Sequence, residues 1–485
     1  MKNGKFIHLT VFDILLILLI SFPTITVNNK VSITLPSKNG FGKSINIPGV
    51  EGEFAVAVTD NKGGVYVAYQ SSWSENNSQN RYIHVYFSYS HDFGKTWNKS
   101  YQIDDNLSSQ VFCDSPSIAY DQKNNYIYIA WKDNRTGFSQ VYIDKSIDQG
   151  KSFSSDVVVY DSIQDLVSPY LPYTVNIKVD DNGKLFISWI GYSSDSLFDS
   201  DIFFSYSTDK GQTFSNPIIV NTVENNDRLT RPWIVIVNEQ TIFVAYSQRS
   251  STVSNIYISR SQDNGISFET PVKITDSSTQ VYTGGIMVVA SSNATLYAVW
   301  TDNRAGNGPQ YLDIYYAYSI DDGQSFSKNV RINDDTIKVA PSSHPAFTRG
   351  AHGSPAIAID TDQNVHIVWE DFRNFVDDTT YCRDIYYTST SNGINFTANT
   401  KVNYVNSNST SVNAADPSII IDSSNNFFLV YSDAVTGNND HPLVYFESIL
   451  QNTNQSSKST SNIAGLEFVS ILSLCLMVLA IKRKK

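Results

Sequence analysis

The sequence predicts an all-β protein, a β-propeller of four-stranded blades, with seven blades as the simplest count. Two repeating patterns predict this fold. The first is a short strand of β-branched and aromatic residues that ends at Trp or Tyr and recurs roughly every 60 residues, as propeller blades do. The second is an eight-residue turn pattern. The strand pattern ends at Tyr69, Trp131, Trp189, Tyr246, Trp300, Trp369 and Tyr431.

The turn pattern is clearest at residues 319–326, SIDDGQSF, which lie between two strand-like runs. The aspartate can accept backbone N–H groups across the turn, the glycine supplies a positive φ, and the last aromatic can pack between layers. We therefore predict a hairpin turn in which the aspartate is structural. Other copies begin at Ser90, Ser146, Ser207, Ser261 and Ser389, and the structural aspartates are Asp92, Asp148, Asp209, Asp263 and Asp321.

The seventh repeat lacks both the turn pattern and a fourth strand, because the chain becomes polar at Gln451. Residues 43–48, KSINIP, resemble the fourth strands of other repeats, such as KNVRIN. We expect this N-terminal strand to complete the last blade and close the ring, which removes open sheet edges.

The two ends of the chain predict export and membrane attachment. Residues 1–28 contain Lys2, Lys5 and an apolar run, typical of a signal peptide or signal-anchor. Residues 29–450 are the predicted propeller, and 451–462 a polar stalk. Residues 463–481 are apolar and, at about 1.5 Å per residue, span about 28 Å as a transmembrane helix; a buried core helix is the alternative. The basic residues 482–485 predict a cytoplasmic tail and an outward-facing propeller.

The composition of the chain limits the kinds of molecule that it is expected to bind. The formal net charge is −12 and no basic stripe is present, which argues against nucleic acid. We predict no cofactor and no metal ion. Of the three cysteines, Cys475 falls in the apolar segment, whereas Cys113 and Cys382 either pair or remain separate thiols.

The face opposite the Asp-containing turns carries the loops that follow each second strand, and binding sites usually lie on such loops. Three blades share an extension there, WKDNR, WTDNR and WEDFR. One interpretation is a ring of guanidinium and carboxylate groups with catalytic Asp133, Asp302 and Asp371 and ligand-binding Arg135, Arg304 and Arg373. The alternative is a repeated structural device, in which each aspartate pairs with its own arginine.

The links between blades add further candidate ligand-binding residues. The long link before the sixth blade contains His344, Arg349 and His352. Two histidines near acids can bind a metal, but this spacing matches no ligand pattern, and polar loop packing is the alternative. The link into the fourth blade contains Arg231 and Trp233, and the indole can support a sugar ring or pack between blades.

The six turns resemble the Asp-box, or BNR repeat, of the sialidase superfamily, and the resemblance covers most of the chain. It implies a propeller in which three arginines hold the sugar carboxylate, with a Tyr nucleophile assisted by Glu and an Asp acid. The chain departs from that pattern. The family has an Arg-Ile-Pro motif before its first blade, where this chain has Asn46, Ile47 and Pro48. The family also has six blades, and none of the 29 tyrosines stands out as a nucleophile.

These observations leave three functions open. The first is a membrane-anchored, extracellular propeller that binds glycans or other cell-surface ligands on its loop-rich face. The second is an active sialidase-like glycoside hydrolase. The third is a structural surface-layer component.

Overall fold

The computed structural model describes the propeller and few residues outside it. The chain divides into Met1–Ser37, which lies outside the described residues, and Lys38–Lys485, which contains the propeller. The described residues are 44–49, 51–74, 81–106, 112–160, 170–193, 196–222, 228–249, 253–277, 283–304, 312–335, 352–374, 382–403, 412–433 and 442–451.

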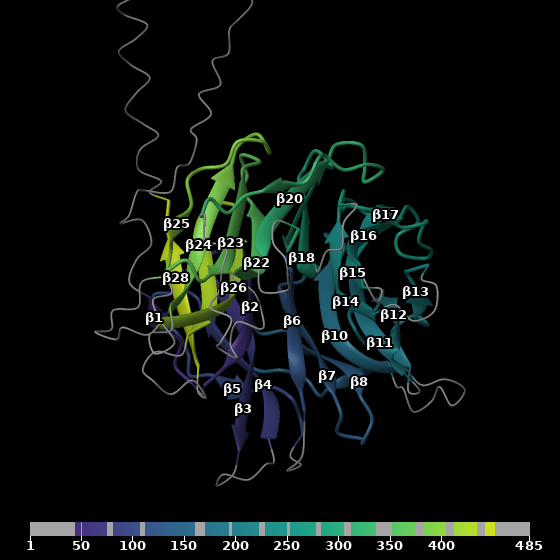
Figure 1. The fold of residues 1–485 in the computed structure, drawn as a ribbon. Helices are drawn as coiled ribbons and strands as arrows, with labels where there is room; N and C mark the ends of the chain where they lie inside the picture. Colours follow the sequence, from purple (N-terminus) through teal and green to yellow (C-terminus); the bar gives the residue numbers. More distant parts are fainter. Residues whose placement is uncertain are drawn as a thin grey trace, which may run out of the picture. The chain divides into compact units, whose positions relative to one another are not determined.

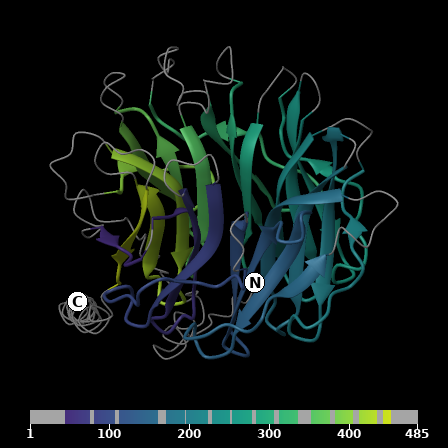
Figure 2. The same cartoon turned by 90° about the horizontal axis from the view of Figure 1, so that it is seen from below.

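The structure confirms a seven-bladed propeller of four-stranded antiparallel blades (Figure 1). Figure 2 shows the blades following one another in sequence order, so that the last blade lies beside the first. In each blade the strands come from consecutive parts of the chain, except at the closure.

The first four blades contain β2 (Glu53–Thr59), β3 (Val65–Ser74), β4 (Arg81–Ser90) and β5 (Tyr101–Gln102); β6 (Asp114–Asp121), β7 (Tyr126–Asp133), β8 (Gln140–Ser146) and β9 (Val157–Tyr160); β10 (Tyr170–Val179), β11 (Leu185–Ser193), β12 (Ser196–Ser207) and β13 (Ile218–Ile219); and β14 (Arg228–Ile236), β15 (Ile242–Arg249), β16 (Ser254–Ser261) and β17 (Val272–Lys273).

The last three blades contain β18 (Thr283–Ala290), β19 (Leu296–Asp302), β20 (Asp313–Ser319) and β21 (Val330–Arg331); β22 (His352–Ile359), β23 (Val365–Asp371), β24 (Cys382–Thr390) and β25 (Thr400–Lys401); and β26 (Val412–Ile421), β27 (Phe427–Asp433), β28 (Leu443–Ile449) and β1 (Ile45–Asn46).

The predicted closure by an N-terminal strand is confirmed. Strand β1 pairs antiparallel with β28, with Ile45 opposite Phe446 and Asn46 opposite Tyr445. The Ile47 N–H continues the ladder by donating to the Val444 carbonyl over 2.9 Å. The first described segment thus completes the last blade, which leaves no missing fourth strand in the ring.

The core lies between neighbouring blades. The second strand of each blade is flanked on both sides, and all seven residues of β23 and of β27 are buried. The aromatic residue that marks each second strand in the sequence is at most 1% exposed. Continuous apolar character is what a strand with two buried faces requires.

The Asp-box turns have the predicted geometry. In blade 3 the Asp209 carboxylate accepts the Thr213 N–H at 2.9 Å, and Gly211 has a φ of 80°. Slight burial opposes ionisation of Asp209, but the hydrogen bonds from Thr213 lower its pKa to about 2. The last aromatic of the turn packs on the preceding blade, as Phe268 does against Phe204, with ring centroids 5.0 Å apart. The equivalent aspartates Asp92, Asp148, Asp263 and Asp321 accept the same kinds of hydrogen bond.

Several predictions fall outside the described residues: the signal segment 1–28, the stalk from residue 452, the apolar segment 463–481 and the basic tail 482–485. Within the described part of the chain, no helix has the length and apolar character needed to cross a membrane. Cys113 is a buried free thiol, and the side chain of Cys382 is not described.

Candidate functional site

The three Trp-x-Asp-x-Arg extensions form one repeated arrangement, which we call the clamp. In blade 6, Asp371 is completely buried and accepts the Trp369 indole N–H at 2.9 Å. The Arg373 backbone N–H and guanidinium donate to the same carboxylate at 2.8 Å. The guanidinium lies over the Tyr386 ring, 4.0 Å from its centroid. The corresponding residues are Trp131, Asp133, Arg135 and Tyr142 in blade 2, and Trp300, Asp302, Arg304 and Tyr315 in blade 5.

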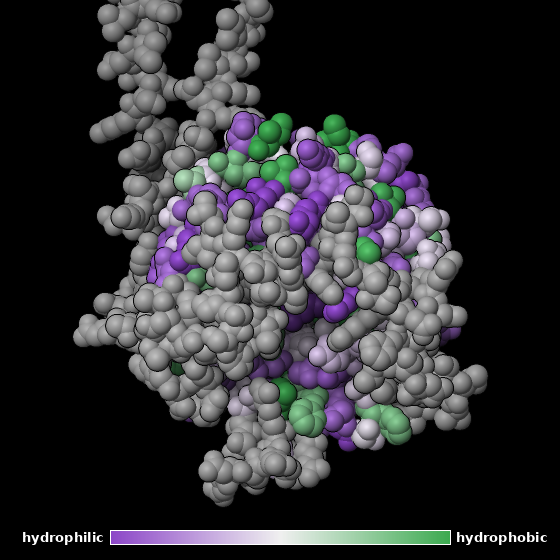
Figure 3. Space-filling model, viewed as in Figure 1, coloured by the Kyte–Doolittle hydropathy of each residue, from purple (hydrophilic) through white to green (hydrophobic). Residues whose placement is uncertain are grey.

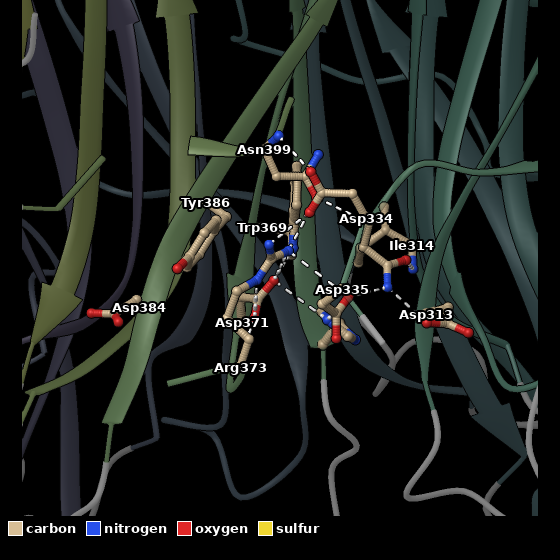
Figure 4. Close-up of polar contacts among 12 residues, drawn as sticks. Asp313, Ile314, Asp334, Asp335, Trp369, Asp371, Arg373, Asp384, Tyr386 and Asn399 are labelled. Atoms are coloured by element: carbon tan, nitrogen blue, oxygen red, sulfur yellow. Dashed lines mark hydrogen bonds and ion pairs between the residues drawn. The ribbon is translucent and has the colours of Figure 1, made fainter. Parts of the chain in front are cut away.

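Each clamp arginine also reaches a residue beside a fourth strand. Arg373 donates to Asp334, which follows β21 of blade 5, and to Asn399, which precedes β25 of blade 6 (Figure 4). Asp334 and Asn399 exchange two further hydrogen bonds, each from the backbone N–H of one to the side chain of the other, at 2.7 and 2.9 Å. The clamp therefore joins the outer strands of neighbouring blades.

The three clamp arginines share no hydrogen-bond partner among the described residues. Their carboxylate partners Asp133, Asp302 and Asp371 are all 0% exposed. These contacts are what the structural alternative predicts. The catalytic role of the aspartates and the ligand-binding role of the arginines remain predictions.

His352, the first residue of β22, extends the clamp of blade 6. Its Nδ1 donates to the Leu312 carbonyl over 2.6 Å, and its Nε2 lies 3.3 Å from an Asp335 oxygen and 3.4 Å from an Asp371 oxygen. Burial opposes the charged form, but the two carboxylates raise the pKa of His352 to about 10. With a proton on Nε2, the positive charge of the His352 imidazolium balances the negative charges of Asp335 and Asp371. His344 and Arg349 lie outside the described residues.

Two clusters bring three possible metal ligands together: Asp313, Asp335 and His352, and His84, Asp104 and Cys113. The Cys113 thiol donates to Asp133 over 3.1 Å, and burial raises its pKa far above the usual range. In the other cluster the His352 imidazole contacts Asp335, and Asp313 accepts from Asn333.

The central channel contains a second polar region. The first strand of each blade carries a β-bulge near the loop-rich end, seen as a register shift in its pairing with the second strand. At five of these bulges a residue with positive φ lies in the wall of a cavity of about 230 Å³, to which the first strands of all seven blades contribute. These residues are Phe54, Ser115, Arg231, Ser354 and Asp416.

One side of this cavity is cationic and aromatic. Arg231 is exposed, with its guanidinium 5.8 Å from the Phe54 ring centroid. The Lys178 ammonium lies 4.6 Å from the centroid of the Trp233 ring. Burial lowers the pKa of Lys178 to about 8, so the Lys178 amine is still mostly protonated at pH 7.

The other side of the cavity carries the Asp416 carboxylate, and Glu370, which is not part of the cavity wall, contacts Asp416. Glu370 accepts the Asp416 backbone N–H at 2.9 Å and pairs with Arg383 at 3.0 Å. Ser354 donates to the Asp416 carboxylate over 3.3 Å. Burial and the Glu370 charge raise the pKa of Asp416 to about 6, against the opposing effect of the Arg383 and Arg231 charges. The Asp416 residue is partly exposed where it borders the cavity.

Comparison with known proteins agrees with this architecture. The BNR/Asp-box repeat model matches residues 88–99, the turn that contains Asp92. The protein is thus a β-propeller whose turns include an Asp-box repeat, and we call it the Asp-box propeller. A comparison with curated protein sequences finds no match.

Three solved structures illustrate the similarity of the Asp-box propeller to known folds. An ulvan lyase of polysaccharide lyase family PL25 aligns with a TM-score of 0.53 at 11% identity, over 83% of this chain and 95% of the lyase. A GH93 α-L-arabinofuranosidase of Fusarium graminearum aligns with a TM-score of 0.49 at 14% identity. The alignment covers 70% of this chain and 93% of the arabinofuranosidase. The Hadza microbial sialidase Hz136 gives 0.45 at 16% identity, and the alignment covers 66% of this chain but only 63% of the sialidase. The lyase alignment shows a shared fold.

The structure divides the predicted site residues of the Asp-box propeller into two groups. Arg231 and Trp233 line the channel cavity, whereas the clamp residues and His352 are engaged at blade junctions. Sequence reasoning missed Lys178, Glu370 and Asp416. A signal was available for Asp416 alone, because proline directly follows the bulge residue in four blades, at Pro116, Pro232, Pro355 and Pro417.

Proposed function

We propose that the Asp-box propeller binds acidic carbohydrate in its channel cavity. The observation that carries this proposal is an exposed arginine, Arg231, in the wall of a cavity that is also lined by Trp233 and Lys178. A guanidinium matches the planar carboxylate of an acidic sugar, and an indole edge or face accommodates its C–H surface. The ulvan lyase that shares the fold was solved with a glucuronic-acid-containing saccharide.

The size of the cavity favours a small ligand group. Its volume of about 230 Å³ is below the roughly 300–1,000 Å³ typical of pockets for drug-sized ligands. We therefore expect the cavity to take one sugar residue at the end of a chain, not an internal stretch of polymer.

In this proposal the propeller is displayed outside the cell. The sequence of residues 463–485 supports it, since an apolar segment followed by a basic tail is typical of a membrane anchor with its charged end inside. The ligand is then a glycan of the cell surface or its surroundings.

A glycan array probed with the purified protein tests the binding proposal, followed by calorimetry on the best acidic ligand. We expect Arg231→Ala to weaken binding at least tenfold and Trp233→Ala to do so by a similar factor. Arg331→Ala is the matched control, because Arg331 is an exposed arginine of β21 that does not line the cavity. Absence of binding to every acidic glycan, or equal loss in the control, would reject the proposal.

The carboxylate pair favours glycoside cleavage as a second candidate function. Asp416 is a carboxyl group with a pKa of about 6 beside the Glu370 carboxylate, and glycosidases use an acid of raised pKa together with a second carboxylate. In this proposal Asp416 donates the proton to the leaving oxygen.

A panel of fluorogenic glycosides that includes a sialoside tests the second candidate. Asp416 has a φ of 51°, which Asn tolerates, so Asp416→Asn removes the acid with little backbone strain. We expect any turnover to fall at least 100-fold in this variant. If turnover persists in Asp416→Asn, another residue is the catalytic acid. If the parent protein turns over no glycoside, the protein is a binding module.

A further inference from the structure

We infer that the face formed by the Asp-box turns is the surface that lies against a lipid bilayer, and that the loop-rich face points away from it. This inference rests on the membrane anchoring in the proposed function. It is carried by the directions of the strands at the two ends of the propeller and by exposed apolar side chains in the turns.

The chain leaves the propeller on the Asp-box face. The third strand of a blade runs toward this face, as β20 does when it ends at Ser319, the first residue of an Asp-box turn. Strand β28 is the third strand of blade 7 and ends at Ile449. The Gln451 N–H then donates to Asn426, in the turn between the first two strands of the blade, over 2.8 Å, which fixes the exit point on this side.

The chain also enters the propeller on this face. Strand β1 is antiparallel to β28, so Ser44, the residue before β1, lies near the end of β28. A Ser44 hydroxyl hydrogen bond to Glu447, two residues before the end of β28, confirms the proximity. The described chain thus begins and ends on the same face.

The length of the polar stalk favours one orientation of the propeller relative to the bilayer. Residues 452–462 separate Gln451 from the apolar segment, and a random-coil linker of eleven residues would have a root-mean-square span of about 18 Å. The loop-rich face lies farther away by the length of a strand, about 23 Å for the seven residues of β28. The stalk therefore favours the Asp-box face as the one near the bilayer.

Isoleucines project from the Asp-box turns of four blades. The side chain of Ile320 is 78% exposed, and the other three are 63–64% exposed. Apolar residues appear among polar ones along the upper rim of the propeller in Figure 3. Exposed isoleucine at the tip of a short turn suits shallow insertion among lipid headgroups, which removes apolar surface from water. The four residues are Ile147, Ile266, Ile320 and Ile394.

Depth-dependent fluorescence quenching tests the orientation in the full-length chain, reconstituted into phosphatidylcholine vesicles with brominated acyl chains. A bimane label is placed on Ile320→Cys or on Phe138→Cys, a matched apolar site that is 52% exposed in a loop of the opposite face. Cys382 and Cys475 are replaced by Ser in both proteins, and the buried Cys113 is kept. We expect at least threefold stronger quenching at position 320. Equal or reversed quenching overturns the inference.

Two further measurements separate the inference from the proposal on which it rests. Flotation of the vesicles comes first: a chain that does not float refutes the membrane anchor itself, whereas glycan binding is measured without vesicles. In a floating chain, Ile266→Asn, Ile320→Asn and Ile394→Asn together should reduce the quenching of a label at Ile147→Cys at least twofold. Unchanged quenching shows that these isoleucines do not contact lipid.

Discussion

Tyr431 donates its phenolic hydrogen to the Ser44 hydroxyl over 2.8 Å, although the two residues lie at opposite ends of the propeller sequence. The Tyr431 hydroxyl also lies 2.9 Å from the Glu447 carboxylate, and all three side chains are buried. This polar contact ties the N-terminal strand to the last blade at the place where the ring closes.

Removing the closing strand should open the ring. We predict that deletion of residues 42–50 lowers the melting temperature by about 10 °C or more, because it exposes the edge of β28 and the apolar surface behind it. Deletion of nine stalk residues, 452–460, is the control. Calorimetry that finds the same cooperative transition in both proteins would contradict the role of the closure. Tyr431→Phe should cost only about 1 kcal/mol, since Ser44 and Glu447 remain bonded to each other.

Loss of a clamp arginine should destabilise the fold. We predict that Arg304→Ala costs about 3 kcal/mol in chemical unfolding, because it leaves the buried Asp302 carboxylate without its charged partner. Arg331→Ala should cost less than about 1 kcal/mol, since that arginine is 39% exposed and its ion pair is long, at 3.4 Å. Equal unfolding free energies for the two variants would remove the structural role of the clamp.

The contribution of His352 to the stability of the folded protein should be lost at alkaline pH. Its pKa in the folded protein is about 10, above the ordinary value of 6.5 for an unfolded chain. The contribution of its ion pairs is therefore complete below pH 6.5 and disappears as the pH rises through 10, at up to about 1.4 kcal/mol per pH unit. The stability difference between the parent and His352→Gln should shrink over this window. A difference that stays constant from pH 6.5 to 10.5 would mean that His352 is neutral in the folded protein.

The turn glycines should tolerate alanine only where space is open. A Cβ at Gly265 would lie 2.6 Å from the Phe204 ring of the preceding blade, whereas one at Gly137 would meet nothing within 4 Å. Both have a φ above 80°, so backbone strain costs each variant about 1 kcal/mol. We predict a further 1–3 kcal/mol, roughly, for Gly265→Ala from the steric clash. Thermal melts of the two variants that coincide would show that the blades adjust at no cost.

The sequence contains enough information for the fold because its strongest signals are local. The aromatic ends of the second strands and the Asp-box turns each depend on residues within one hairpin, and the similarity of residues 43–48 to other fourth strands predicts the closing strand. The position of a side chain around the channel depends on contacts between blades. Asp416 and Lys178 therefore gave no local signal beyond the proline that follows Asp416.

The clamps show why a motif alone did not decide between a site and a structural device. The Trp-x-Asp-x-Arg spacing fixes the pairing of Asp371 with Arg373, but the direction of the guanidinium depends on Tyr386 and Asn399, which belong to later strands. Sequence spacing could not supply these partners. The structure directs attention to Arg231, an exposed residue that lines the channel cavity.

A crystal structure of the propeller soaked with an acidic oligosaccharide tests the central proposal most directly. We predict difference density in the channel cavity, with the sugar carboxylate within hydrogen-bond distance of the Arg231 guanidinium and a sugar ring beside Trp233. Density on another surface, or an empty cavity at ligand concentrations that saturate binding in solution, would contradict the account.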